Sequence, residues 1–265
     1  MTTSTPILMY HSVADEPPPT TRRLAVGPSA LREQLAWLSD HGYSGMTFHD
    51  AAEALVGSGL PDRTVVLTFD DGYADFVTTA LPLLRRYGFP ATLFVTTGWV
   101  ADAGSNAAGK PLDRTLRWDQ IRELAQSEIE IGAHGHSHAA LDELSATDLR
   151  RELTHSRALL EDCIGAPVPT LAYPFGYSNE AVRRAAHEAG YRYGAAVRNM
   201  RATPSADPFL VPRLTIRRST GPVVFAEAVD GSARGWLPLM WRDRMLTACW
   251  AVVRKPRARI RRSTG

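Results

Sequence analysis

The feature that most constrains this chain is a short apolar strand that ends in two adjacent carboxylates. The run from residue 65 to 69 is rich in β-branched residues, which is typical of a buried strand. Asp70 and Asp71 follow it directly, and Gly72 comes next. Two neighbouring acids at such a position repel each other and lose hydration, so a bound cation would stabilise them. A metal held by one carboxylate would leave the other free as a base; in the alternative interpretation Asp71 caps the next helix.

Segments with the pattern of buried strands alternate with segments of helical periodicity at least six times. Strands joined by crossover helices form parallel sheets, so the chain is predicted to have an α/β fold. The spacing favours an irregular or incomplete (β/α) barrel of about seven parallel strands. The predicted strands are residues 7–10, 43–48, 65–69, 91–95, 129–131, 170–173, 191–197 and 211–216, and the predicted helices are residues 28–41, 50–56, 74–87, 118–126, 147–163, 179–189 and 223–229.

Polar residues follow several of the predicted strands. In a (β/α) barrel the active site lies at the carboxyl ends of the strands, where segments distant in sequence meet. We therefore expect these polar groups to converge on one mouth of the barrel. They are His11, Asp70 and Asp71, the histidines of residues 134–138, the segment 174–176, and Arg213.

Three histidines, His134, His136 and His138, lie within five residues directly after a predicted strand. Neutral imidazole is the commonest protein ligand for Zn²⁺ and related ions. Two of these histidines and one carboxylate from another strand end would form a three-ligand site with open positions for water and substrate. The spacing permits any of the three pairs of histidines, and the alternative is a solvated histidine-rich turn.

Three motifs in this order resemble those of the polysaccharide deacetylases, carbohydrate esterases with a chitooligosaccharide-deacetylase-like domain. Residues 68–73 (TFDDGY) look like the first motif, residues 134–138 (HGHSH) like the second, and residues 171–176 (LAYPFG) like a variant of the third. The resemblance extends over about residues 6–230. His11, within the sequence Tyr-His-Ser, is similar to a histidine of a variant subgroup that includes poly-N-acetylglucosamine deacetylases.

The resemblance implies roles for the first two motifs. Asp71, His134 and His138 would bind a divalent metal ion, most often zinc. Asp70 would be the general base that takes a proton from the water that the metal activates. The family gives His136 no ligand role, so it is expected to be an ordinary loop residue.

The third motif and the end of the chain depart from the family pattern. The main-chain N–H of Phe175 matches the family's oxyanion donor, but Ala172 stands where an arginine usually orients the catalytic aspartate. The family's late general-acid histidine is also missing, since no histidine follows His187. His11 could supply that acid, or it could be a buried, hydrogen-bonded residue at a strand end. Arg213 could keep the catalytic aspartate ionised, although a surface salt bridge is the favoured interpretation.

The charge of the chain is unevenly distributed. Residues 234–262 carry nine Arg or Lys and one acid, whereas the whole chain has a net charge of only +2. We therefore predict a catalytic domain over residues 1–232 and an amphipathic, basic extension over residues 233–265. This extension could be a terminal helix packed on the barrel, or it could contact anionic lipid at a membrane surface. The mildly acidic body gives no indication of nucleic-acid binding.

The cysteine content and the amino terminus bear on the compartment. Cys163 and Cys249 are far apart and have no metal-type spacing, so a disulfide framework is not expected. Residues 1–6 lack the charged and apolar parts of a secretory signal, and the chain has no apolar run long enough to span a membrane. We expect a cytoplasmic protein, at the inner face of the membrane if the extension binds lipid.

The predicted function is a metal-dependent hydrolase that removes acetyl groups from N-acetylated sugars or glycans. One alternative is a hydrolase of the same superfamily that acts on a linear amide outside sugars. Another is a degenerate glycan-binding domain, which Ala172 and the missing late histidine would suggest. The joint presence of Asp70, Asp71, His134 and His138 argues against a pure binder, because binding alone needs no base beside a metal site.

Overall fold

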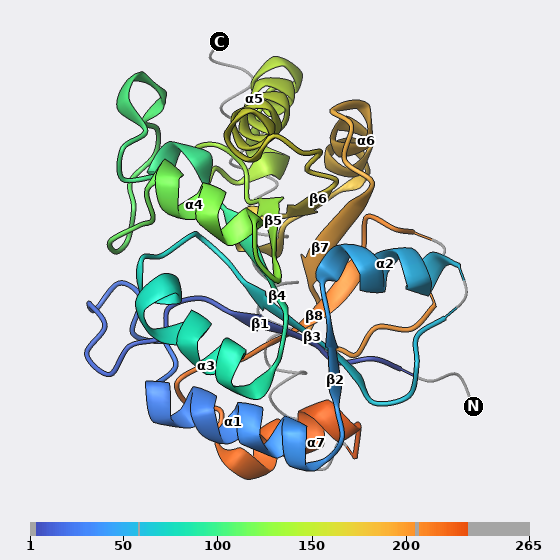
Figure 1. Ribbon diagram of the computed structural model, residues 1–265. Helices are drawn as coiled ribbons and strands as arrows, with labels where there is room; N and C mark the ends of the chain where they lie inside the picture. Colours follow the sequence, from blue (N-terminus) through green and yellow to red (C-terminus); the bar gives the residue numbers. More distant parts are fainter. Residues whose placement is uncertain (1–3, 58, 205–206, 233–265) are drawn as a thin grey trace.

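The structure is a computed structural model that describes residues 4–57, 59–204 and 207–232. Its strands are β1 (Ile7–Tyr10), β2 (Ser44–Met46), β3 (Thr64–Phe69), β4 (Ala91–Val95), β5 (Ile129–Ala133), β6 (Thr170–Ala172), β7 (Tyr193–Val197) and β8 (Val211–Thr215). All the pairings between them are parallel, and β1 pairs with both β3 and β8. Seven strands thus form a closed ring in the order β1-β8-β7-β6-β5-β4-β3 (Figure 1). The predicted (β/α) barrel is confirmed, and the ring of strands is closed.

The eighth strand, β2, lies outside the ring. Its three residues pair with Thr64–Val66 of β3, whereas β4 pairs with Thr68 and Phe69 of the same strand. A Cβ atom on Gly45 would lie only 2.7 Å from the ring of Pro90, so glycine lets β2 approach the start of β4 closely. This short strand therefore extends the sheet at its amino end without entering the barrel.

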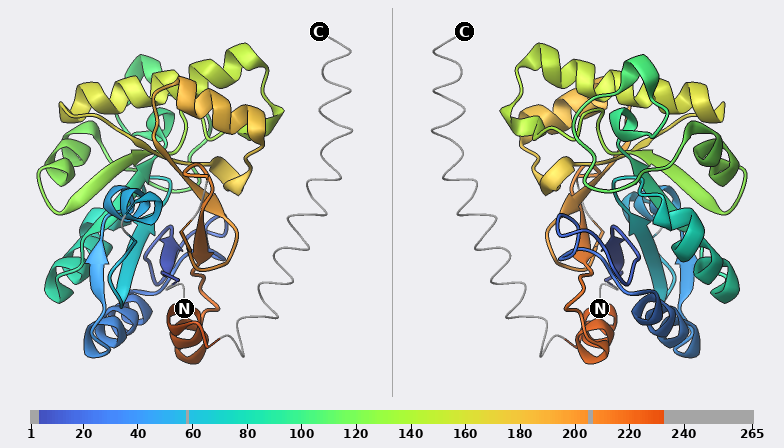
Figure 2. Two further views of the ribbon diagram at one scale, coloured as in Figure 1. Left: turned by 90° about the vertical axis from the view of Figure 1, so that its right-hand side faces the viewer. Right: turned by 90° about the vertical axis from the view of Figure 1, so that its left-hand side faces the viewer.

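Helices cover the outside of the barrel and one of its ends. They are α1 (Pro28–Asp40), α2 (Phe48–Val56), α3 (Leu81–Tyr87), α4 (Trp118–Ala125), α5 (Ala146–Ile164), α6 (Glu180–Glu188) and α7 (Pro222–Asp230). The last helix, α7, lies beside the first, α1, where the rings of Trp37 and Phe225 meet edge to face with centroids 5.9 Å apart (Figure 2). Helix α2 instead packs Phe48 and Leu55 into the interior cluster of the barrel, and so closes its amino end.

The strand residues alternate between the interior of the barrel and the helical layer. Ile7, Val66 and Val211 belong to the interior cluster, whereas their neighbours Leu8 and Leu67 pack against the surrounding helices. Alternate residues of a strand share one face. The interior series of β3 therefore continues from residue 66 to residues 68 and 70, and that of β8 from residue 211 to residue 213.

The predicted continuous helix over residues 74–87 is wrong in its first half. A π-helix spans Phe76–Ala80, and α3 begins only at Leu81. Pro82 lies in the first turn of α3, where its ring has no N–H to donate and would clash with the carbonyl four residues earlier in a regular α-helix. The wider π-helical turn accommodates this residue.

The predicted basic extension, residues 233–265, lies outside the described residues. Its proposed roles at the membrane or on the barrel therefore stay predictions. Within the described part of the chain, no helix combines the length and the apolar character needed to cross a membrane.

Candidate active site and metal centre

The carboxyl ends of the barrel strands surround a cavity of about 230 Å³. Residues that are far apart in the sequence meet there, as the positions of the polar residues after the strands predicted. Arg213 is the exception among the predicted site residues, because its fully buried side chain lies within the barrel. The predicted site residues that line the cavity are His11, Asp70, Asp71, His134, His138 and Phe175.

Asp71, His134 and His138 form a group with the geometry of a metal site. Nε2 of His134 lies 3.4 Å from Oδ1 of Asp71, and Nε2 of His138 lies 3.2 Å from the same oxygen. One ligand atom from each of the three residues lies within 4.8 Å of the other two. His136 is not part of this group, since its Nδ1 lies 2.9 Å from the hydroxyl of Thr97.

The protonation of this group fits a cation. Nδ1 of His134 lies 2.9 Å from the main-chain oxygen of Ala172, and a carbonyl can only accept, so the proton of this imidazole is on Nδ1. Its Nε2 faces Oδ1 of Asp71, a buried oxygen that accepts no hydrogen bond from the described residues. Two imidazoles and a carboxylate that converge in this way are the kind of donors that hold a divalent metal ion.

The interpretation of Asp71 as a helix cap is wrong. Asp71 has a left-handed backbone with φ of 79°, and its carboxylate faces the two histidines. The next helical segment begins only after Asp75. Burial disfavours the ionised form, but the contacts with His134 and His138 bring the pKa of Asp71 well below its ordinary value. Asp71 is thus a buried anion that faces imidazole nitrogens.

Asp70 is held by Arg213, and its Oδ2 lies 4.0 Å from Nε2 of His134. Nη1 of Arg213 donates to Oδ1 of Asp70 at 2.7 Å, and Nη2 donates to Oδ2 at 2.8 Å. Nη1 also donates to the hydroxyl of Thr68 at 3.0 Å. Both side chains are buried, so the favoured interpretation of Arg213 as part of a surface salt bridge is wrong. A bidentate guanidinium fixes both oxygens of the carboxylate and leaves them little freedom to rotate.

The charges of this group leave room for a bound cation. Burial raises the pKa of Asp70, but the positive charge of Arg213, aided by His134, outweighs it and keeps this pKa below its ordinary value. The site thus buries two carboxylates, Asp70 and Asp71, and only Asp70 contacts a guanidinium. The remaining negative charge is costly in a medium of low polarity unless a cation neutralises it.

His11 lies at the end of β1 and lines the same cavity. Its Nδ1 is buried and has no hydrogen-bond partner among the described residues, so the interpretation of His11 as a hydrogen-bonded structural residue finds no support at this atom. Burial lowers the pKa of His11, and the carboxylates of Asp71 and Asp70 oppose this without reversing it. A protonated His11 is consequently a stronger acid than a histidine in water.

The loop that carries His134 and His138 is fixed by Glu152 of α5, which the sequence did not indicate. The Oε2 atom of Glu152 accepts the main-chain N–H groups of His136 and Ser137, both at 2.9 Å, and Oε1 accepts the Ser137 hydroxyl at 2.6 Å. Trp99 stacks on the ring of His138 with centroids 4.7 Å apart. The loop is therefore held between α5 and the segment after β4.

Phe175 follows β6 in a turn with φ of 61°. Its side chain is 57 % exposed, and its ring meets that of His138 edge to face with centroids 4.6 Å apart. Asp71, with φ of 79°, and His138, with φ of 59°, also have left-handed backbones. Such conformations are costly for residues other than glycine and are found at functional sites.

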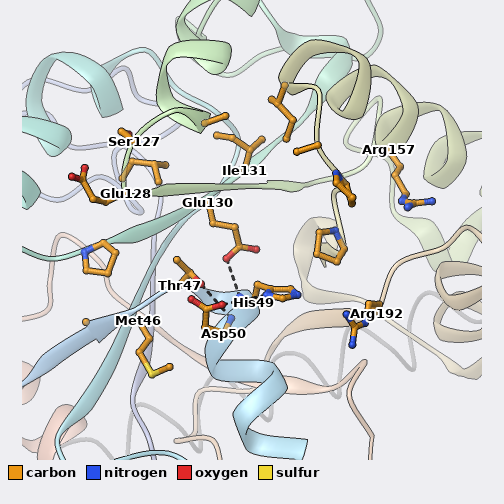
Figure 3. Close-up of a pocket in the computed structure, with 18 of the residues that line it drawn as sticks. Met46, Thr47, His49, Asp50, Ser127, Glu128, Glu130, Ile131, Arg157 and Arg192 are labelled. Carbon is orange, nitrogen blue, oxygen red and sulfur yellow. Dashed lines mark hydrogen bonds and ion pairs between the residues drawn. The ribbon is translucent and has the colours of Figure 1, made fainter.

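A larger cavity, of about 790 Å³, lies at the opposite, amino end of the barrel (Figure 3). Both of its arginines have partners: Arg157 pairs with Glu161 at 2.8 Å, and Arg192 with Glu53 at 3.3 Å. Glu130 accepts the main-chain N–H of His49 at 2.9 Å. Among the described residues, the group of possible metal ligands lies at the other end, so we place the chemistry in the smaller cavity.

Comparisons with known proteins point to one family. Residues 57–194 match the family model for polysaccharide deacetylase. The chain is 32 % identical over 190 residues to YxkH of Bacillus subtilis, which bears the name of this family, and the match covers 71 % of this chain and 63 % of that protein. It is 38 % identical over 134 residues to the poly-beta-1,6-N-acetyl-D-glucosamine N-deacetylase of Escherichia coli, and this match covers 48 % of this chain and 20 % of that protein.

A solved structure shows the same fold over most of the chain. The Streptococcus pyogenes deacetylase PplD in complex with acetate superposes with a TM-score of 0.77 at 27 % identity, over 86 % of this chain and 99 % of that chain. The chain thus spans less than two thirds of the two curated relatives described above but nearly the whole of this solved chain. His11 and Arg213 lie outside the residues that match the family model.

Proposed function

Because this chain belongs to the polysaccharide deacetylase family, we propose that it is a metal-dependent hydrolase that removes acetyl groups from N-acetylated glycans. One observation carries the proposal. Asp71, His134 and His138 surround a position suited to a cation. A second carboxylate, Asp70, lies beside them and accepts two hydrogen bonds from Arg213. Three metal ligands with an oriented base beside them are the groups that hydrolysis by metal-activated water requires.

Each residue of the chain then has a defined task. Asp71, His134 and His138 would hold a divalent cation, which would supply Lewis-acid activation of water and of the acetamido carbonyl. Asp70 takes a proton from the attacking water as the new C–O bond forms. The main-chain N–H of Phe175 donates to the oxyanion of the tetrahedral intermediate. When the C–N bond breaks, His11 gives a proton to the leaving nitrogen, and the products are acetate and an amino sugar.

We propose zinc as the metal, because two imidazole nitrogens and one carboxylate oxygen suit its preferences and leave a position open for water. The proposed substrate class is a glycan of N-acetylglucosamine type. The relatives from Escherichia coli and Staphylococcus aureus are named as deacetylases of such a polymer. The cavity here is lined by Phe175 and Leu112, whose side chains are among the exposed large apolar groups and suit the apolar faces of a sugar ring.

The alternative of a degenerate binding domain was based on Ala172 and on the missing late histidine. Arg213 contacts Asp70 in the way expected of the missing arginine, and His11 supplies an imidazole at the cavity wall. These two residues argue against the binding domain. The alternative of a linear amide outside sugars calls for a direct comparison of substrates.

The test is acetate release from N-acetylglucosamine oligomers by protein that has been stripped with a chelator and then reloaded with Zn²⁺. We expect no turnover in the stripped protein, recovery after reloading, and no recovery in a His138→Ala variant. A panel of N-acetylated linear amines tests the second alternative in the same assay. Turnover without metal, or turnover confined to the linear amines, would contradict the proposal.

A further inference from the structure

The carboxylate of Asp75 links two segments of the site. Asp75 lies four residues after Asp71, on the same loop as both catalytic carboxylates. Its Oδ2 accepts the hydroxyl of Ser12 at 2.5 Å and the main-chain N–H of Val13 at 3.0 Å. Ser12 is fully buried, and it directly follows His11.

The position of Asp75 in its own helix does not explain this contact. Asp75 immediately precedes the π-helix Phe76–Ala80, but its side chain makes no capping hydrogen bond there. Its other oxygen, Oδ1, is buried without a partner among the described residues. Burial of a carboxylate costs free energy, and burial raises the pKa of Asp75. The bonds to Ser12 and Val13 are the interactions that offset this cost.

His11 depends on its neighbours for its position. Its Nδ1 has no hydrogen-bond partner in the part of the chain that the structure describes, so no bond from these residues orients the ring at that atom. On one side of it, the main-chain N–H of Asp70 donates to the carbonyl of Tyr10 at 3.0 Å. On the other side, Asp75 holds Ser12 and the residue after it. The loop that carries Asp70 and Asp75 thus forms hydrogen bonds with the residue before His11 and with the two residues after it.

We infer that Asp75 is a positioning residue. It holds the imidazole of His11 in the position from which it protonates the leaving nitrogen. This inference rests on the proposed role of His11 as the general acid. A general acid contributes about 10²–10⁴-fold to the rate, and a displacement of about 1 Å in an active site can cost about 10²-fold. Asp75 needs to touch neither substrate nor metal to have such an effect.

The experiment compares an amide substrate with an ester. An N-acetylglucosamine oligomer releases an amine, which must be protonated as it leaves, whereas para-nitrophenyl acetate releases a phenolate, which leaves without a proton. For Asp75→Ala we expect kcat on the oligomer to fall roughly 10- to 100-fold, with ester turnover within about threefold of wild type and an unchanged metal content. Asp75→Asn keeps an acceptor for both donors and should recover most of the loss.

Two further variants sharpen the result. Ser12→Ala removes one of the two bonds to Asp75 and should lower oligomer turnover by a smaller factor, about three- to tenfold. Thr170→Val is the matched control, because Thr170 also donates its hydroxyl to a carboxylate, that of Glu130 at 2.6 Å, but at the amino end of the barrel. Its kcat on both substrates should stay at the wild-type level.

A double-mutant cycle with His11→Ala decides whether Asp75 acts through His11. If it does, Asp75→Ala causes no further loss of oligomer turnover once His11 is removed. Additive losses, equal losses on both substrates, or a lower metal content would overturn the inference, as would wild-type turnover in Ser12→Ala. Undiminished oligomer turnover in His11→Ala would instead overturn the proposed acid itself, and the inference with it.

Discussion

Arg213 and Asp70 form a bidentate ion pair inside the barrel, with N–O distances of 2.7 and 2.8 Å and almost no exposure of either side chain. The arginine comes from the last strand, β8, and the aspartate from the end of β3. Ala172 on β6, where the family usually has its arginine, leaves its main-chain oxygen to His134. The guanidinium that contacts Asp70 thus comes from β8 and not from β6.

The ion pair predicts that removing one of its two charges lowers the unfolding free energy more than removing both. Arg213→Met leaves the carboxylate of Asp70 buried without a partner and should cost about 3–5 kcal/mol of unfolding free energy. The double variant Arg213→Met with Asp70→Asn removes both charges and should be clearly more stable than Arg213→Met alone. Urea denaturation of the three proteins measures this. A double variant that is no more stable than Arg213→Met would show that the unpaired carboxylate of Asp70 is not what destabilises the single variant.

Glu152 should control metal affinity without contacting the metal. It holds the main chain between the two metal histidines, and loss of such a support typically costs about 10- to 100-fold in affinity. Glu152→Ala is therefore expected to weaken Zn²⁺ binding by that factor in a competition titration with a chromophoric chelator. Glu161→Ala, on the same helix but paired with Arg157, is the control. Equal affinities for the two variants would show that Glu152 does not support the site.

Glu130 should make stability depend on pH. Burial raises its pKa above the ordinary 4.5, and hydrogen bonds from Thr170 and from the main chain of His49 only partly oppose this. The folded state therefore binds this proton more tightly than the unfolded state. The associated stability is fully present below a pH of about 4.5 and is lost as the pH rises through the higher pKa of the folded state.

Glu130→Gln lacks this titration. The unfolding free energy of the variant minus that of wild type should therefore increase as the pH rises through this window, whatever constant offset the substitution brings. Urea denaturation of both proteins at a series of pH values gives the difference, in which the other titrating groups cancel. A difference that stays flat, or falls with pH, would mean that the pKa of Glu130 is not raised.

At position 175, glycine should give a more stable protein than alanine, which reverses the usual order of stability. The φ of 61° at Phe175 is costly for any residue with a Cβ atom, by about 1 kcal/mol or more. Phe175→Gly should therefore unfold at a higher temperature than Phe175→Ala, although both lose the ring. Thermal unfolding followed by circular dichroism compares them directly. A more stable alanine variant would mean that this turn is not left-handed in solution.

The fold and the metal group could be predicted from the sequence, because strand ends in a barrel meet and because residues 70–71 and 134–138 carry recognisable patterns. The sequence offers Arg213 as a residue that keeps Asp70 ionised but favours a surface salt bridge, although the alternation of Arg213 with Val211 on β8 places its side chain inside the barrel. Glu152 gave no local signal, since its partners lie 15 and 16 residues away and only the packing of α5 joins them. Pro82 is a signal for the break in the helix after residue 75 that the prediction of a continuous helix over residues 74–87 did not use.

The most direct test of the account separates the two neighbouring carboxylates. Asp70→Asn and Asp71→Asn are measured for bound Zn²⁺ and for acetate release from N-acetylglucosamine oligomers. We expect Asp70→Asn to keep its metal and to lose turnover by at least about 10²-fold, because it removes only the base. Asp71→Asn should lose the metal and turnover together. If Asp70→Asn loses its metal as Asp71→Asn does, or if it retains turnover, the division of roles between the two carboxylates is wrong.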